Sequence, residues 1–136
     1  MRAGFTLIEL LIAMVIAALL ATIALPSWRG VVMRTQRGDA TAALYAVAAA
    51  QERYRLIYGR YASQSGPAPP VGLGLEASER GWYALRIERA DATTFLASAR
   101  PSPGSPQASD SSCRVFTIDE TGRRASTPDG PATCWR

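Results

Sequence analysis

The feature that most constrains this chain is a long apolar run close to its N-terminus. Between Phe5 and Leu25 only Thr6, Glu9 and Thr22 are not plainly apolar. A helix of about 21 residues, rising about 1.5 Å per residue, spans roughly 30 Å, which is the hydrocarbon thickness of a bilayer. The run therefore predicts a transmembrane helix with only residues 1–4 in front of it.

The charges around the run give a first indication of its orientation. A secretory signal carries a shorter apolar stretch followed by its cleavage site, which this N-terminus does not match. Arg2 precedes the run and favours a cytoplasmic N-terminus by the positive-inside rule. Arg29, Arg34 and Arg37 follow the run and weaken that preference, so charge alone leaves the orientation open.

Glu9 does not suit a plain membrane anchor. It lies in the first third of the run, where a carboxylate costs about 2.5–3.5 kcal/mol on insertion scales. One interpretation is that its side chain reaches the nearby headgroups. The other is that it pairs with a positive group in an assembly of such helices. If the chain is cut after Gly4, the new α-amino group of Phe5 on a neighbouring chain is that group.

Residues 4–10, GFTLIEL, resemble the N-terminal signature of type IV prepilins and of the related type II secretion pseudopilins. The resemblance implies that a prepilin peptidase cuts between Gly4 and Phe5 and that the Phe5 amine is N-methylated. It also implies that Glu9 steers docking of the subunit onto the filament. The leader is then residues 1–4, the transmembrane and filament-core half of the helix is 5–28, and the periplasmic or extracellular globular domain is 29–136.

The helical pattern extends well beyond the apolar run. Pro26 stands where pilins often carry a helix-softening proline, and its missing hydrogen bond predicts a kink or local melting near residues 22–26. Apolar and large side chains then recur at steps of three and four, and Gly59 is suited to end the helix. This stripe, which we expect to lie on a sheet, consists of Ala40, Leu44, Val47, Gln51, Tyr54 and Tyr58.

The remainder of the chain is typical of strands joined by turns. Residues 61–81 are rich in Pro and Gly and predict a loop. Strands are expected at residues 82–89, 94–99, 113–119 and 123–126, with Glu120-Thr121-Gly122 as a hairpin turn. The sequence therefore predicts an α+β protein, in which a long N-terminal helix packs on a four-stranded antiparallel sheet, as in the pilin fold.

The chain has two cysteines, Cys113 and Cys134. A zinc site needs more nitrogen and sulfur ligands than these, and the chain has no histidine. In an exported domain such a pair predicts a disulfide, and closing a loop of about twenty residues is worth roughly 3 kcal/mol. A Cys that starts the third strand and a terminal Cys-Trp also resemble minor pilins of the PilE kind, a group that includes the DNA-receptor pilin ComP.

Catalytic chemistry is not indicated by the sequence. Histidine, the commonest general base, is absent. Asp119 and Glu120 are adjacent at the end of a predicted strand, where neighbours point to opposite faces, which makes them a poor acid–base pair. Asp110, Asp119 and Asp129 lack the ligand spacing of a calcium site. We therefore expect no enzyme, no cofactor and no metal site.

The leading hypothesis is a structural, minor subunit of a type IV pilus that supports pilus assembly and hence twitching motility, adhesion or DNA uptake. It implies contacts with other pilin subunits through the N-terminal helix. It also implies a single-pass inner-membrane form before assembly and an extracellular pilus form afterwards. A type II secretion pseudopilin is one alternative. A ComP-like DNA receptor, which would use arginines of exposed loops against phosphates, is the other, although the net charge of +4 is modest. The predicted phosphate contacts are Arg80, Arg89, Arg100, Arg123 and Arg124.

Overall fold

A computed structural model of the chain describes residues 6–136, with the backbone alone described for residues 24–27 and 29. The chain divides into two compact units, Met1–Val32 and Met33–Arg136. The elements in order are α1 (Leu7–Tyr58), β1 (Tyr83–Ala90), β2 (Phe95–Pro101), η1 (Pro106–Ser109), β3 (Cys113–Asp119), β4 (Arg124–Pro128) and α2 (Pro131–Cys134).

The first unit is formed by the N-terminal part of α1. Its large apolar side chains are exposed, from Leu7 at 80% to Ile23 at 75%. The backbone is helical without interruption from Leu7 to Tyr58, so the predicted local melting near Pro26 is wrong. Proline removes a single hydrogen bond, and the helical bonds on both sides of it maintain the helix. The kink at Pro26 stays a prediction.

Over the described residues, no helix combines the length and the apolar character that crossing a membrane needs. Phe5 and Leu25, which bound the span predicted from the sequence, lie outside the residues whose side chains are described. The transmembrane segment stays a prediction.

In the second unit, α1 contributes one face to the core. The predicted stripe from Ala40 to Tyr54 is buried, as expected. Tyr58 was wrongly included: its side chain is 42% exposed, and its ring packs on that of Tyr54 at 4.4 Å between centroids instead of entering the core. The helix ends at Gly59, whose φ of 71° is in the left-handed region and whose N–H donates to the Arg55 carbonyl.

Gln51 is the polar amide of the buried stripe, and its hydrogen bonds account for its burial. Its side-chain amide donates to the Ala62 carbonyl at 2.9 Å and accepts from the Ala62 N–H at 2.8 Å. Both polar ends of the amide are therefore satisfied although the side chain is fully buried. The pair fixes the chain just after α1 back onto the helix.

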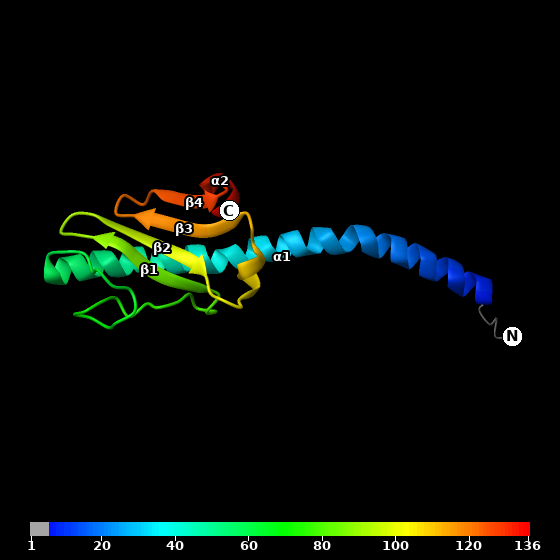
Figure 1. Ribbon diagram of the computed structural model, residues 1–136, viewed down its shortest axis with the longest axis horizontal. Helices are drawn as coiled ribbons and strands as arrows, with labels where there is room; N and C mark the ends of the chain where they lie inside the picture. The colour runs from blue at the N-terminus through cyan, green and yellow to red at the C-terminus, as the bar shows by residue number, and fades with distance from the viewer. Residues whose placement is uncertain (1–5) are drawn as a thin grey trace. The chain divides into compact units, whose positions relative to one another are not determined.

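The four strands form an antiparallel sheet in the order β1-β2-β3-β4 (Figure 1). The face turned toward α1 is apolar and buried, which confirms the predicted α+β architecture of a long helix packed on a four-stranded sheet. Its side chains are Tyr83, Leu85, Phe95, Ala97, Ala99, Phe116 and Ile118. Each observed strand starts and ends within two residues of its predicted bounds.

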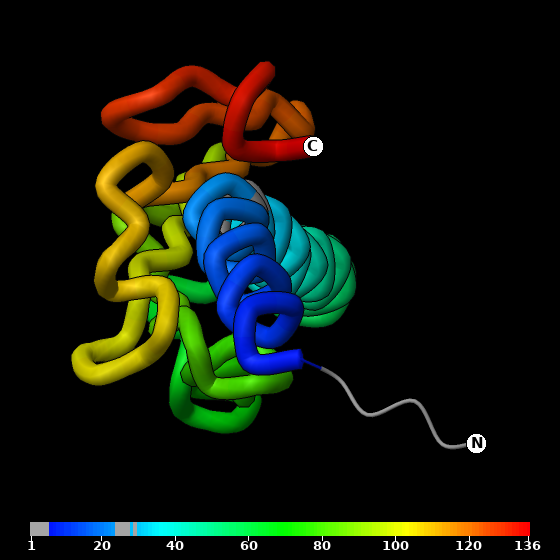
Figure 2. The backbone as a smooth tube through the Cα atoms, turned by 90° about the vertical axis from the view of Figure 1, so that its right-hand side faces the viewer, coloured from blue at the N-terminus to red at the C-terminus, as the bar shows by residue number. Residues whose placement is uncertain are grey.

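The predicted disulfide is present between Cys113 and Cys134, whose Cα atoms lie 5.7 Å apart. It holds the C-terminal segment beside β3 and β4 (Figures 1 and 2). Trp135 completes this attachment, because its indole N–H donates to the Ala125 carbonyl at 3.0 Å. The two single-turn elements η1 and α2 were not foreseen; each begins with a proline, which is favoured at the first helical position.

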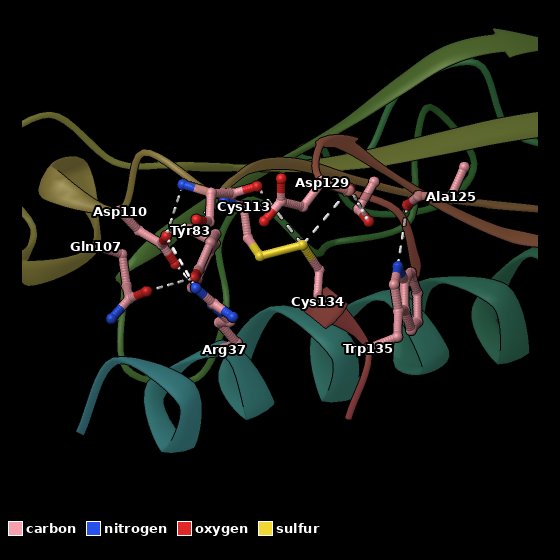
Figure 3. Close-up of a disulfide and its surroundings, with 11 residues drawn as sticks. Arg37, Tyr83, Gln107, Asp110, Cys113, Ala125, Asp129, Cys134 and Trp135 are labelled. Carbon is pink, nitrogen blue, oxygen red and sulfur yellow. Dashed lines mark hydrogen bonds and ion pairs between the residues drawn. A yellow bond between two sulfur atoms is a disulfide. The ribbon is translucent and has the colours of Figure 1, made fainter. Parts of the chain in front are cut away.

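A buried polar network lies next to the disulfide (Figure 3). Arg37 on α1 makes two hydrogen bonds to the Asp110 carboxylate, at 2.7 and 3.0 Å. Asp110 also accepts from the backbone N–H of Cys113 at 3.2 Å. Tyr83 donates to Gln107 at 2.9 Å, and burial raises the pKa of its hydroxyl. The network attaches the connection between β2 and β3 to the helix.

Candidate nucleic-acid interface and assembly residues

The predicted assembly residues lie at the start of the chain. Gly4 and Phe5 fall outside the described residues. Glu9 lies in the first turn of α1, where its backbone N–H donates to the Thr6 hydroxyl oxygen at 3.3 Å. Its side chain is exposed among apolar neighbours and forms no ion pair with any residue that the structure describes.

The face of the sheet turned away from α1 is called here the outer face. The pairing of β1 with β2 determines which of their residues lie on it. Arg86 lies opposite Ser98, and Ile87 lies opposite Ala97. Leu96, the residue of β2 next to Ala97, lies opposite Arg89, so Glu88 is an extra residue in β1. This irregularity is a β-bulge.

The bulge decides where Arg89 points. In a regular strand, Arg89 would share a face with Leu85 and Ile87 and would be turned toward the helix. Because Glu88 is inserted, Arg89 is exposed and Ala90 packs against the core instead. Arg86 and Arg89 are therefore both on the outer face.

Arg100 on β2 adds a third guanidinium group to this face. It pairs with Ala84 in the register, and its neighbour Ala99 is buried on the opposite face. Arg100, Arg86 and Arg89 thus occupy successive levels along β1 and β2, and we call them the outer arginine row. Sequence reasoning left Arg86 out of the candidate contacts, although its alternation with the apolar Leu85 and Ile87 was a usable signal.

One carboxylate lies within the outer arginine row. The Oε1 atom of Glu88 accepts from the Ser98 hydroxyl at 2.5 Å and from the Arg100 guanidinium at 3.3 Å. The hydrogen bond from Ser98 is the main cause that lowers the pKa of Glu88, with further contributions from Arg100 and Arg86. The carboxylate is therefore ionised at neutral pH.

A second carboxylate, Asp119, lies on the same face at the end of β3 and is directed into the β3–β4 turn. It accepts from the N–H groups of Thr121 and Arg123, both at 3.0 Å. Burial raises the pKa of Asp119, but the hydrogen bonds from Thr121 and Arg123 outweigh it, so the pKa is lowered. Gly122, with a φ of 75°, provides the left-handed residue that this turn requires.

The structure does not gather the five predicted arginines into one surface. Arg89 and Arg100 belong to the outer arginine row. Arg80 precedes β1 and lies over the Trp82 ring, 5.0 Å from its centroid, and Arg123 lies in the β3–β4 turn. Arg124 is turned to the helix side, because it pairs with Ile118 and donates to the Tyr45 hydroxyl at 3.2 Å.

Acidic and sulfur ligands are not gathered into any cluster suited to a metal ion within the described part of the chain. What the outer face offers chemically is a set of positive hydrogen-bond donors on a rigid sheet. The planar guanidinium group matches the geometry of phosphate and carboxylate, and binds both through paired hydrogen bonds.

Two family models match this sequence. A model of the prokaryotic N-terminal methylation motif matches residues 1–25. A model described as type IV minor pilin ComP, DNA uptake sequence receptor, matches residues 26–117. The chain belongs to this family of type IV minor pilins. It is thus a minor pilin subunit, a structural protein whose family functions in an extracellular pilus, and the prepilin resemblance is confirmed.

Solved structures include two pilins that resemble this minor pilin. One is the non-core minor pilin PilV of Neisseria meningitidis, with a TM-score of 0.49 and 19% identity over 63% of this chain and 76% of that one. The other is a type IV pilin from Shewanella oneidensis, with a TM-score of 0.48 and 22% identity over 76% of this chain and 98% of that one. No curated protein matches the chain. At these scores, family membership rests on the family models.

Proposed function

We propose that this minor pilin enters its filament through a processed N-terminus. A prepilin peptidase cuts the precursor between Gly4 and Phe5 while the helix is held in the inner membrane, and the Phe5 amine is methylated. Glu9 then pairs with the amine of Phe5 on a neighbouring subunit. The observation that supports this proposal is the exposed carboxylate of Glu9, which has no ion-pair partner among residues 6–136 and lies in a segment that matches the methylation motif.

Mass spectrometry of the mature N-terminus tests the processing step. We expect a chain that starts at methylated Phe5, and an uncut precursor when Gly4 is replaced by a bulky residue. A mature chain that starts at Met1 would refute the proposal.

The docking step is tested by Glu9→Ala, with Met14→Ala as a control on the same exposed helix. Both variants are expected to insert in the membrane, and only Glu9→Ala is expected to be missing from sheared filaments. Normal incorporation of Glu9→Ala would remove Glu9 from docking.

The outer arginine row supports a second function, the binding of DNA at the pilus surface. Its three guanidinium groups are exposed, and one of them, Arg100, has an ion-pair partner among the described residues. Arginine contacts to backbone phosphates supply essentially all of the non-specific affinity for DNA and are independent of sequence. The printed description of the matched family, a DNA uptake sequence receptor, agrees with this assignment. Attachment of DNA is the step that this face would contribute to DNA uptake.

The salt dependence of binding tests this function, with the full chain held in a non-ionic detergent. The triple variant Arg86→Gln, Arg89→Gln, Arg100→Gln is compared with Arg34→Gln, Arg53→Gln, Arg60→Gln, which changes the net charge equally at exposed sites outside the row. We expect the slope of log K against log salt to fall by about 2.7 for the first triple variant, at about 0.9 per phosphate contact. An equal loss with the control, or no binding by the parent at low salt, would reject the row as a DNA site.

A further inference from the structure

Glu88 occupies an unusual position, because it is the bulge residue and the only acidic side chain on β1. The hydroxyl that holds it belongs to Ser98, which is 1% exposed. That hydrogen bond is 2.5 Å long, while the contact to Arg100 is 3.3 Å. The carboxylate is therefore fixed by the sheet, and Arg100 is the more loosely bound partner.

We propose that Glu88 limits the DNA affinity of the outer arginine row by competing with phosphate for the Arg100 guanidinium. The proposal rests on the DNA-binding function proposed above and identifies the group that regulates that face. A phosphate that approaches Arg100 meets a fixed negative charge already bound to the same side chain.

The exposure of the pair determines how strong this competition is. The Arg100 side chain is 53% exposed and that of Glu88 is 36% exposed. Ion pairs that water reaches in this way are weak, so a phosphate is able to displace the carboxylate. Like charges placed side by side at an interface nevertheless reduce affinity. Glu88 thus favours weak, reversible binding over tight retention of any polyanion.

Other charged groups near the row do not share this arrangement. Arg86 and Arg89 flank Glu88 in β1 and add positive charge. Asp119 is directed into the β3–β4 turn, where Thr121 and Arg123 hold it. Glu88 is therefore the carboxylate in direct contact with an arginine of the row.

The variant Glu88→Gln tests the proposal, because its amide oxygen still accepts from Ser98 while the charge is removed. We expect the full chain in non-ionic detergent to bind duplex DNA about fivefold more tightly at low salt, the factor that corresponds to an exposed charge pair. Glu76→Gln is the control, since it removes an exposed carboxylate from the loop before β1. That control is expected to change affinity by less than about twofold.

The same substitution in an Arg100→Gln background separates competition for Arg100 from a general charge effect. In that background we expect Glu88→Gln to change the DNA affinity by less than about twofold, because the effects of coupled residues are not additive. An undiminished effect would show that Glu88 acts elsewhere and would overturn the inference. So would a Glu88→Gln variant that binds like the parent. If the parent itself does not bind DNA, the proposed DNA function fails first, and the role of Glu88 falls with it.

Discussion

The two faces of the sheet use the same four strands for different purposes. On the helix-facing side, Phe116 and Ile118 are almost completely buried. On the outer face, Arg86 and Arg89 are exposed, and Ser98 is covered by a carboxylate. Residues next to each other in the chain thus belong alternately to the core and to a charged surface. The core face therefore holds the sheet to the helix, while the outer face carries the charged groups that are open to contacts with other molecules.

The largest expected effect comes from the core face. Phe116→Ala leaves a cavity beside Tyr83 and Trp135, whose rings it contacts, and is expected to lower the free energy of unfolding by about 3–5 kcal/mol. Thr117→Ala, one residue away on the outer face, is the matched control and is expected to cost less than about 1 kcal/mol. Denaturant unfolding followed by circular dichroism measures both; similar losses would contradict the division between the faces.

The disulfide links β3 to the C-terminal segment, and its removal is expected to cause the next largest loss of stability. Replacing Cys113 and Cys134 together by Ser is expected to cost about 3 kcal/mol, because the unfolded chain gains freedom. The same unfolding measurement applies, with the parent under reducing conditions as the comparison. A loss below about 1 kcal/mol would show that Trp135 and the packing of α2 hold the tail without the bond.

Acid is expected to act on the turns and the outer face rather than on the core. Hydrogen bonds from the Thr93 N–H and from the side chain and N–H of Thr94 lower the pKa of Asp91 well below its usual range. A lowered pKa stabilises the folded state above the unfolded value of 3.8, and this stability is lost as the pH falls through the folded value.

The melting temperature should therefore fall as the pH is lowered below about 4. Asp91→Asn should reduce this dependence, which a series of thermal melts would measure. A melting curve that is the same at pH 3 and pH 6 would contradict the assignment.

The smallest effect on stability is expected for Arg89→Ala, and it tests the bulge directly. With Arg89 on the outer face, the substitution is expected to change the free energy of unfolding by no more than about 0.5 kcal/mol. The salt slope of DNA binding is expected to fall by about 0.9. A clear gain in stability would mean that Arg89 faces the core, where an apolar residue is preferred.

The fold was predictable because strong periodic signals specify it. Leu44 and Val47 recur at helical spacing, and β3 runs between Cys113 and a glycine-containing turn. Tyr58 shows the limit of such a pattern, since periodicity does not reveal where the facing sheet ends. The disulfide was predictable from the two cysteines, the lack of further zinc ligands and an N-terminus that indicates export.

The surface was much less predictable. Arg124 was grouped with Arg89 because both are charged, but the pairing register turns Arg124 toward Tyr45. Arg86 and Glu88 were passed over because their significance depends on a neighbouring strand. Alternation with Leu85 and Ile87 is the one local signal for Arg86. Glu88 carries none, since a β-bulge arises from the pairing of two strands and not from the composition of one.

The bulge at Glu88 also bears on how relatives of this chain should be compared. One residue more or fewer before this point exchanges the orientations of Arg89 and Ala90 without changing a single side chain. A gap of one position in β1 therefore removes one positive charge from the outer face. Pilins with the same arginines but no bulge would present a different face to their surroundings, and a count of basic residues would not reveal it.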